Sequence, residues 1–296
     1  MTMSRILSMI IMLVWQLSPL GAATKHTICY LGVTNGDAVT GGQCQRVNGM
    51  VARMLSHLER VKYVDVSALG ADPGNKEALN AALTSKGVTY TVALRLDSVV
   101  TKEKRYTRKN RDGGQEEYSR YEGRTNFDVV FTSVKSGRTT TKHAYTLVTM
   151  QEDTEKAALG AMDGVDEAVK TFMLNFFAIQ GKLKLIDHEK TALIDVGSQD
   201  GVEKGDDFGV YNSKGDELGK LDCKEVLGRH AAQGTINRNK KVKAILAALD
   251  NGEELTVKTL RKSEPIFSQS MLRSGSLEKA YDDAKSLIKG IGSLFK

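Results

Sequence analysis

The spacing of the apolar residues changes near Gly181 and Lys182, and this change constrains the fold more than any other feature of the chain. Before it, apolar stripes at every third or fourth position, the spacing of amphipathic helices, alternate with short strand-like runs. After it, glycines separate a series of short apolar runs. We therefore predict an α+β domain with a mixed sheet over residues 24–181 and a small β-rich domain over residues 182–262.

The first region has the predicted element order βαβα followed by βββα. A nearly continuous apolar run favours a first strand that is buried on both faces, and the stripe after a glycine-rich loop favours a helix. The expected elements, in chain order, are strand 28–33, helix 47–58, strand 64–68, helix 79–83, strands 88–97, 118–134 and 139–150, and one long helix through 158–176. This order is typical of a mixed sheet with helices packed on it.

The second region has the pattern of a small β-barrel or sandwich, because many short strands alternate with glycine-containing turns. The expected strands are 191–196, 209–211, 218–226, 231–236 and 255–260.

The first 23 residues have the pattern of a secretory signal peptide. Arg5 is their only charged residue, an apolar run follows over residues 6–15, and the small residues 21–23 come last. The run is shorter than the roughly 20 residues that a membrane-spanning helix needs. We expect cleavage after Ala23 and export to the periplasm, with association with the outer membrane left open. The alternative is an uncleaved anchor.

The chain ends in a predicted Ser-rich linker and amphipathic helix over residues 263–296. An apolar stripe of this kind needs a surface to pack on. Its balanced polar face favours a groove on a protein over a lipid surface, so any membrane contact is peripheral. The alternative is that the helix packs on its own domain. The stripe residues expected to bind a partner are Leu277, Tyr281, Ala284, Leu287, Ile288, Ile291, Leu294 and Phe295.

The cysteines leave two interpretations open. Cys29 and Cys44 are close enough in sequence for a disulfide, which export permits, while Cys223 is distant. The alternative is that all three are small buried apolar residues. Zinc is not expected, because no CxxC motif occurs and the five histidines do not have metal-ligand spacing.

A basic cluster lies between the third and fourth predicted strands. Two interpretations stay open, and the first is contact with an anionic surface of the envelope, such as lipid headgroups, cell-wall polymer or another protein. The alternative is a solvated hairpin tip. Nucleic acid is not an expected partner of an exported protein, and the net charge of +6 is mild. The residues of this basic cluster are Lys102, Lys104, Arg105, Arg108, Lys109 and Arg111.

No motif identifies a catalytic reaction. The loop at 36–42 has the spacing of a phosphate-binding loop, but Gly42 and Gln43 stand where its lysine and its hydroxyl belong. No Gly-x-Ser-x-Gly elbow occurs, and His143 and His188 do not form a triad pattern. We therefore predict no catalytic residue, metal or cofactor. A hydrolase with a site assembled from scattered residues is the less favoured alternative.

The stretch VGSQDGVEKGDDFGVY at 196–211, followed by 218–221 and 231–236, is similar to the SH3-like C-terminal module of the flagellar basal-body assembly protein family FlgT. The wider relatives are the curli secretion protein CsgG and the penicillin-binding-protein activator LpoB. The resemblance covers roughly residues 26–262. It departs from the family in lacking the extra N-terminal flagellar domain and the lipid-anchor cysteine of CsgG and LpoB, and in adding the tail helix.

This resemblance implies an SH3-like β-barrel module at 182–262 and a non-enzymatic periplasmic protein. Such a protein assembles a flagellar or secretion machine by protein–protein binding, as a scaffold or a homo-oligomeric ring. The alternative is a periplasmic regulator of cell-wall synthesis, or a protein that binds an anionic envelope polymer.

Overall fold

The computed structural model describes residues 25–71, 75–109, 113–187 and 190–262 of the 296-residue chain. The described chain divides into two compact units. The first contains residues 25–29, Leu55–Tyr90 and Thr171–Lys262, and the second contains Tyr30–Met54 and Thr91–Lys170. The predicted signal peptide at 1–23 and the predicted helix within 263–296 lie outside the described residues. The expected boundary between residues 181 and 182 stays a prediction.

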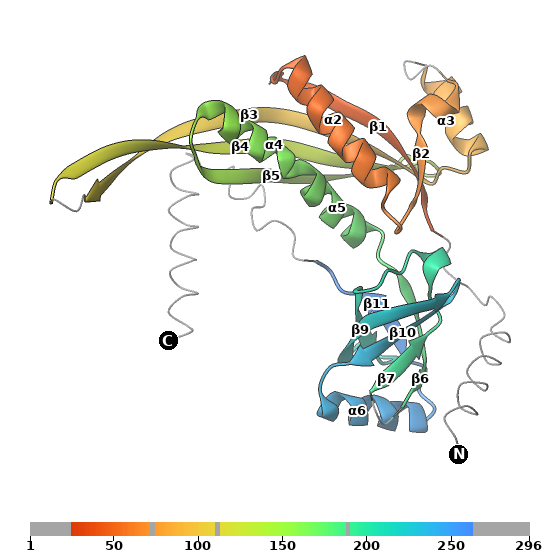
Figure 1. The fold of residues 1–296 in the computed structure, drawn as a ribbon. Helices are drawn as coiled ribbons and strands as arrows, with labels where there is room; N and C mark the ends of the chain where they lie inside the picture. The colour runs from red at the N-terminus through yellow and green to blue at the C-terminus, as the bar shows by residue number, and fades with distance from the viewer. Residues whose placement is uncertain (1–24, 72–74, 110–112, 188–189, 263–296) are drawn as a thin grey trace. The chain divides into compact units, whose positions relative to one another are not determined.

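The elements are labelled in Figure 1. In chain order they are β1 (Thr27–Ala38), α2 (Gly41–Ser56), β2 (Lys62–Asp65), the 3-10 helix η1 (Val66–Leu69), α3 (Lys76–Ser85), β3 (Tyr90–Lys109), β4 (Gln115–Ser133), β5 (Thr139–Gln151), α4 (Thr154–Asp163), α5 (Val165–Phe176), β6 (Gln180–Ile186), β7 (Thr191–Ile194), the 3-10 helix η2 (Ser198–Asp200), β8 (Asp207–Tyr211), β9 (Glu217–Gly228), β10 (Ala231–Ile236), α6 (Asn239–Asp250) and β11 (Thr256–Thr259).

The strands form one sheet and one barrel. The sheet has the order β2-β1-β3-β4-β5, and the closed barrel has the order β10-β7-β6-β11-β8-β9. The predicted fold class, a mixed-sheet α+β region followed by a small β-barrel, is therefore confirmed.

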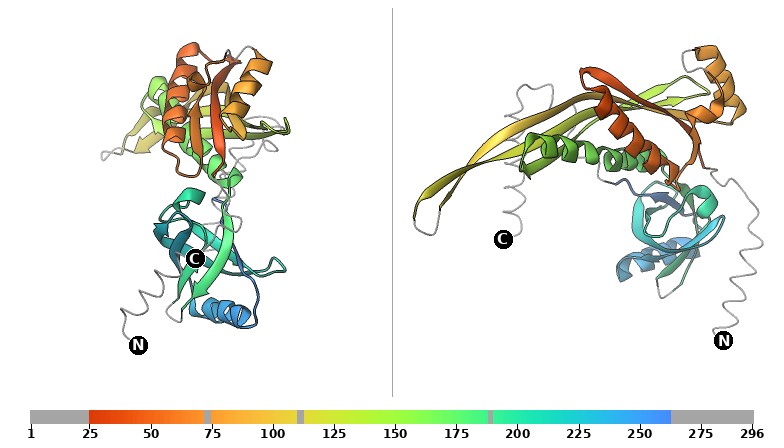
Figure 2. Two further views of the ribbon diagram at one scale, coloured as in Figure 1. Left: turned by 90° about the vertical axis from the view of Figure 1, so that its right-hand side faces the viewer. Right: turned by 45° about the horizontal axis from the view of Figure 1, so that its top comes forward.

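Helix α4 packs on β4 and β5 at positions where side chains are absent or small. A Cβ added to Gly123 of β4 would lie only 1.8 Å from the carbonyl oxygen of Ala157. Gly160 of α4 lies against Val148 of β5 in the same way. Figures 1 and 2 show α2 and α4 on the same side of the strands, and an ion pair of 2.6 Å between Arg46 and Asp163 joins these two helices.

Replacing Gly123 by Ala should destabilise the protein by about 1–3 kcal/mol, because the new methyl group overlaps backbone that cannot move without displacing α4. Urea unfolding followed by circular dichroism measures the change. The matched control is Gly114→Ala, where no atom lies within 4 Å. Equal stability of the two variants would show that α4 does not pack at Gly123.

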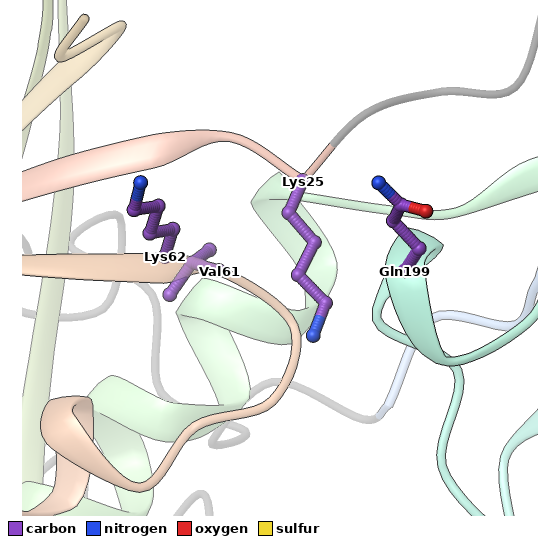
Figure 3. Close-up of a pocket in the computed structure, with 4 residues that line it drawn as sticks. All are labelled: Lys25, Val61, Lys62 and Gln199. Carbon is purple, nitrogen blue, oxygen red and sulfur yellow. The ribbon is translucent and has the colours of Figure 1, made fainter. Parts of the chain in front are cut away.

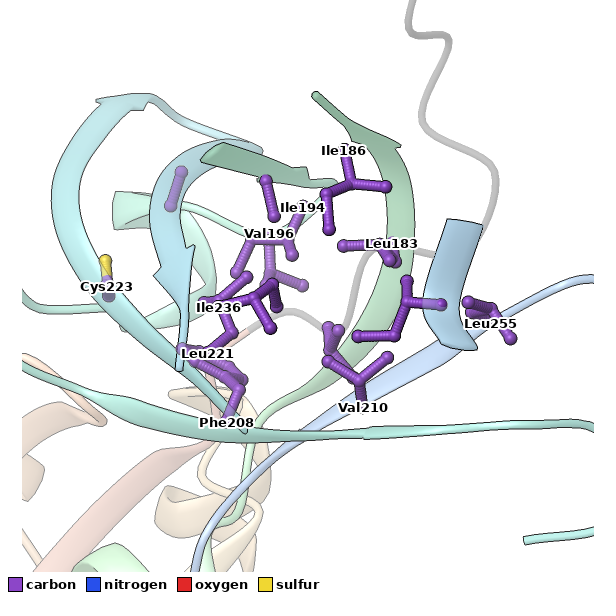
Figure 4. Packing of buried hydrophobic residues seen from close by; sticks show 14 of the residues in the cluster. Leu183, Ile186, Ile194, Val196, Phe208, Val210, Leu221, Cys223, Ile236 and Leu255 are labelled. Carbon is purple, nitrogen blue, oxygen red and sulfur yellow. The ribbon is translucent and has the colours of Figure 1, made fainter. Parts of the chain in front are cut away.

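The barrel encloses its own apolar core in the first compact unit. Figure 4 shows the side chains of this core. As expected from the sequence, Val202, Phe208 and Val210 belong to it. Helix α6 was not predicted, although Val242 and Ile245 reach the same core at helical spacing. Other members of the core are Leu183, Ile194, Val196, Leu221, Ile236, Leu255 and Val257.

The first strand is longer than expected. Residues 28–33 were predicted as the strand and 36–42 as a flexible loop, but β1 extends to Ala38 and α2 begins at Gly41. The extension lies in close contact with β3. A Cβ on Gly36 would lie 2.9 Å from the carbonyl oxygen of Asp97. The apparent phosphate-binding loop is therefore mostly strand and helix.

Two other elements end early for local reasons. The second strand was expected over 64–68 but stops at Asp65, whose carboxylate accepts the backbone N–H of Ser67 at 2.8 Å and caps η1. The single long helix expected through 158–176 is two helices separated at Gly164. The hydroxyl of Thr146 donates a hydrogen bond to the Ala161 carbonyl beside this break.

The segment between β7 and β8 contains two buried carboxylates. Asp200 accepts the backbone N–H of Gly197 at 2.8 Å and lies 3.1 Å from the ring nitrogen Nδ1 of His230. Asp206 receives two hydrogen bonds of 2.9 Å from Nη2 of Arg60. Between them Gly201 has a φ of 84°, as its predicted turn requires.

The ion pair between Arg60 and Asp206 is buried, with side-chain exposures of 3% and 10%. Burial lowers the pKa of the Arg60 guanidinium, while the charges of Asp206 and Glu203 act in the opposite direction. A Cβ on Gly201 would lie 2.8 Å from the Arg60 Cα atom, so the two backbones are in close contact. The pair thus joins the 59–62 segment to the barrel within one compact unit.

Replacing Asp206 by Ala should destabilise the protein by about 3–5 kcal/mol, because it leaves the Arg60 charge buried without its partner. Replacing both residues by Leu should recover a large part of that loss. The exposed pair gives the control, since Arg46→Ala should cost no more than about 1 kcal/mol. Chemical denaturation of the four proteins measures these differences, and a small effect of Asp206→Ala alone would contradict the burial.

The cysteines are all free thiols in the structure. Cys29 is fully buried within β1, and the Cys29–Cys44 bridge that the sequence left open stays a prediction. Burial raises the pKa of Cys29 to about 11, with a further contribution from Asp65. Burial also raises the pKa of Cys223 to about 11, whereas Cys44 is only half-buried.

Cys44 should therefore react first with a thiol reagent at pH 8, while Cys29 and Cys223 stay protonated and covered. We expect the Cys44→Ser variant to react about a hundredfold more slowly in the folded state. When the unsubstituted protein is unfolded in guanidinium without reductant, three thiols should react. A count of one would mean that the Cys29–Cys44 bridge forms after all.

Candidate functional site

Strands β3 and β4 continue as a two-stranded ribbon beyond the rest of the sheet (Figures 1 and 2). On one side, β5 pairs with β4 only from Tyr121 onward. On the other side, β1 ends at Ala38, soon after Gly36 has passed Asp97. We define the ribbon as residues 100–109 of β3 and 115–120 of β4.

The ribbon contains five of the six predicted basic residues, and Arg111 lies outside the described residues. Acids lie next to two of them, one across the strand pair and one on the same strand. Lys104 forms an ion pair of 2.6 Å with Glu122 of β4, and Arg105 lies 3.9 Å from Glu103. Of these five basic residues, three have no ion pair in the described structure: Lys102, Arg108 and Lys109.

Aromatic side chains stiffen this ribbon. The rings of Tyr106 and Tyr118 stack across the two strands at 5.7 Å, and the Arg120 guanidinium lies 5.2 Å from the Tyr118 ring centre. The ribbon thus combines a cross-strand pair of rings with charges of both signs, and contact of its basic residues with an anionic surface stays a prediction.

The face of the sheet opposite α4 carries a polar cluster. Neighbouring residues of a strand point to opposite faces, so Arg124 points away from α4 because Gly123 faces it. Asn126 accepts a hydrogen bond of 2.8 Å from Nε of Arg124 and donates one of 2.7 Å to Ser98 of β3. The guanidinium of Arg124 lies 3.7 Å from the ring centre of Tyr145 on β5.

Arg124 and Tyr145 are both 8% exposed. Burial lowers the pKa of the Arg124 guanidinium, and it raises the pKa of the Tyr145 phenol to about 12. Nη2 of Arg124 has no hydrogen-bond partner within the described structure. This arginine is therefore held by a ring and an amide instead of a carboxylate.

Apolar side chains flank the cluster. Leu147 of β5 is opposite Arg124 in the strand register and is 45% exposed. Val100 lies two residues beyond Ser98, on the same face, and is 42% exposed. We call the surface formed by exposed Val100 and Leu147, on the same face as the buried cluster, the open face.

One titratable pair lies beside this cluster. Asp128 of β4 contacts Nδ1 of His143 on β5. Burial and then the charge of Asp128 raise the pKa of the Asp97 carboxyl on β3. In the sequence His143 suggested only a triad with distant residues, which its pattern does not form, and its partner in the structure is Asp128, the residue opposite it on β4.

Other functional classes find little support in the described residues. They contain no group of three or more potential ligands that could hold a metal ion. Among the helices that the structure describes, none is long and apolar enough to span a bilayer. The predicted partner-binding helix at 277–295 lies outside the described residues.

No protein-family model and no curated protein matches this chain. Among solved structures, the PelC dodecamer from Paraburkholderia phytofirmans is 13% identical, with a TM-score of 0.27 over 49% of this chain and 86% of that one. Lipoprotein GNA1162 from Neisseria meningitidis is 10% identical, with a TM-score of 0.31 over 51% and 99%. The LpoB C-terminal domain from Salmonella enterica is 11% identical, with a TM-score of 0.25 over 48% and 92%.

Scores this low carry no argument about fold or function. LpoB is one of the wider relatives that the sequence resembles, but the resemblance to the FlgT family stays an expectation from the sequence alone.

A double-mutant cycle on Arg124→Leu and Tyr145→Leu should give a coupling energy of about 0.5–2 kcal/mol, the range of a cation–π contact that excludes water. Tyr145→Phe should keep most of this coupling, because the ring face remains. Equilibrium unfolding of each variant provides the values. Additive effects of the two Leu substitutions would mean that the contact contributes nothing.

Proposed function

We propose that this protein is a non-enzymatic assembly component of the cell envelope that works by binding other proteins, including copies of itself, through the open face and the ribbon. The N-terminal signal pattern supports the periplasmic location. The single observation that carries the proposal is the ribbon, whose two strands run past both neighbouring strands of the sheet.

The ribbon favours protein binding because its outer backbone groups have no strand beside them within the described sheet. Such edges accept an added strand from another chain, and the side chains select which chain binds. Exposed Val100 and Leu147 add apolar area at the base of the ribbon. Partner binding through strand edges is also a route to a homo-oligomeric ring.

The barrel and the C-terminal segment have roles in the same proposal. The barrel at 182–262 acts as a separate module, and the amphipathic segment at 277–295 attaches the protein to a partner. Assembly of a flagellar or secretion machine is the specific role that we propose from the FlgT resemblance.

The second candidate is a periplasmic regulator, or a protein that binds an anionic envelope polymer. It is favoured by Lys102, Arg108 and Lys109, which have no ion-pair partner in the described structure and therefore present free positive charge. Replacing these three by Gln separates the two candidates, because polymer binding should then be lost while protein binding is largely kept.

Site-specific photo-crosslinking in the native envelope tests the main proposal. A photoreactive residue at Leu147 or Arg108 should give a defined adduct, identified by mass spectrometry as a second copy or as another envelope protein. Leu185, which is on the barrel and 50% exposed, is the matched control position. Absence of adducts at 108 and 147, or the same adducts at 185, would overturn the proposal.

Leu147→Glu should reduce recovery of the identified partner by about tenfold, since a charge at the centre of an interface is costly to bury. Leu185→Glu should leave recovery unchanged. Equal thermal unfolding of both variants and the native protein would exclude a folding defect as the cause.

A further inference from the structure

The first compact unit contains a cavity that the proposed function does not use. Its volume is about 420 Å³, and Lys25, Val61, Lys62 and Gln199 line it (Figure 3). Lys25 precedes β1, Val61 and Lys62 lie at the start of β2, and Gln199 belongs to η2. All four residues lie in the same compact unit.

The backbone around this cavity is well anchored. The N–H of Lys62 donates to the His26 carbonyl at 2.9 Å, and the N–H of Gln199 donates to the Arg229 carbonyl at 2.9 Å. The buried Arg60–Asp206 pair and the close contact of Gly201 fix the chain just before Val61. Because the backbone amide of Gln199 is used, only its side-chain amide is available to a ligand.

The charge in the cavity is positive. Lys25 is paired at 3.3 Å with Glu59, which is itself 69% exposed, so its charge is only partly neutralised. Lys62 is exposed, and the described structure contains no ion pair for it. The charge of Arg60 is paired with Asp206. The lining of the cavity thus carries two ammonium groups, of which only Lys25 is paired with a carboxylate.

We propose that this cavity binds a phosphate group of a soluble metabolite or of a lipid headgroup. Ammonium groups bind phosphate as rotatable point charges, and the Gln199 amide supplies a neutral donor beside them. Figure 3 shows the Lys25 and Lys62 ammonium groups pointing in different directions, so Lys62 turns toward the ligand on binding. Buried Val61 provides an apolar wall for the group that carries the phosphate.

Titration with inorganic phosphate, followed by ¹H–¹⁵N NMR at constant ionic strength, tests this site. We expect shifts of the Lys62 backbone amide and the Gln199 side-chain amide. Lys62→Gln should weaken binding by about tenfold, the loss expected for one charge-assisted hydrogen bond. Glu59→Gln should tighten binding by about threefold, because it frees the Lys25 charge.

Lys258→Gln is the matched control, since Lys258 is an exposed lysine on β11 outside the cavity. It should leave phosphate binding unchanged. Equal weakening by Lys62→Gln and Lys258→Gln would overturn the proposal, because it would indicate general attraction to a basic protein. No effect of Glu59→Gln, together with no shift at Gln199, would also overturn it.

Vesicles identify the source of the phosphate. Binding to phosphatidylglycerol vesicles over phosphatidylcholine vesicles, lost in Lys62→Gln, would assign the site to a lipid headgroup. Binding of inorganic phosphate without Lys62-dependent vesicle binding would assign it to a soluble ligand. If neither probe depends on Lys62, the cavity is not a phosphate site. None of these outcomes depends on Leu147 or the ribbon, so the proposed function is tested separately.

Discussion

The buried ion pair between Arg60 and Asp206 is the interaction on which the first compact unit depends. Two charges removed from water are stabilised here by both carboxylate oxygens of Asp206 accepting from one guanidinium nitrogen, while Nε and Nη1 of Arg60 have no hydrogen-bond partner in the described structure. That geometry requires the backbone at Gly201 to approach Arg60, which a side chain at position 201 would prevent. This contact therefore fixes the barrel loop against the start of β2. The lysine-lined cavity lies beside that contact, so its position is fixed too.

Much of the fold was predictable because it follows from local patterns. Val47 and Val51 mark α2 by helical spacing, and Gly201 and Gly205 have the positive φ that tight turns need. Helix α6 was missed although its stripe, Val242 and Ile245, has helical spacing and no glycine interrupts residues 235–251, because the glycines on either side indicated only strands. The extension of β1 could not be predicted, since it depends on β3 lying beside it.

The candidate site was harder to predict, because its contacts join residues that are distant in sequence. The run of basic residues near 105 was visible, but Glu122 is brought to Lys104 only by strand pairing. Nothing near Arg124 in sequence indicates Tyr145, although both are buried on one face of the sheet. Counting charges along the chain therefore overestimated how basic the ribbon is.

The ribbon has a kinetic consequence. Its strands lie outside the sheet, where each has only the other as a hydrogen-bonded neighbour among the described strands, and an isolated two-stranded hairpin is marginally stable in water. Its amide hydrogens should exchange with solvent through local opening at a small free-energy cost, while those of β4 beside β5 exchange only through larger unfolding events. A partner strand bound along the ribbon would raise the free-energy cost of opening it toward that of β4 beside β5. The amide exchange rate of the ribbon would therefore report how much of the protein has a partner bound.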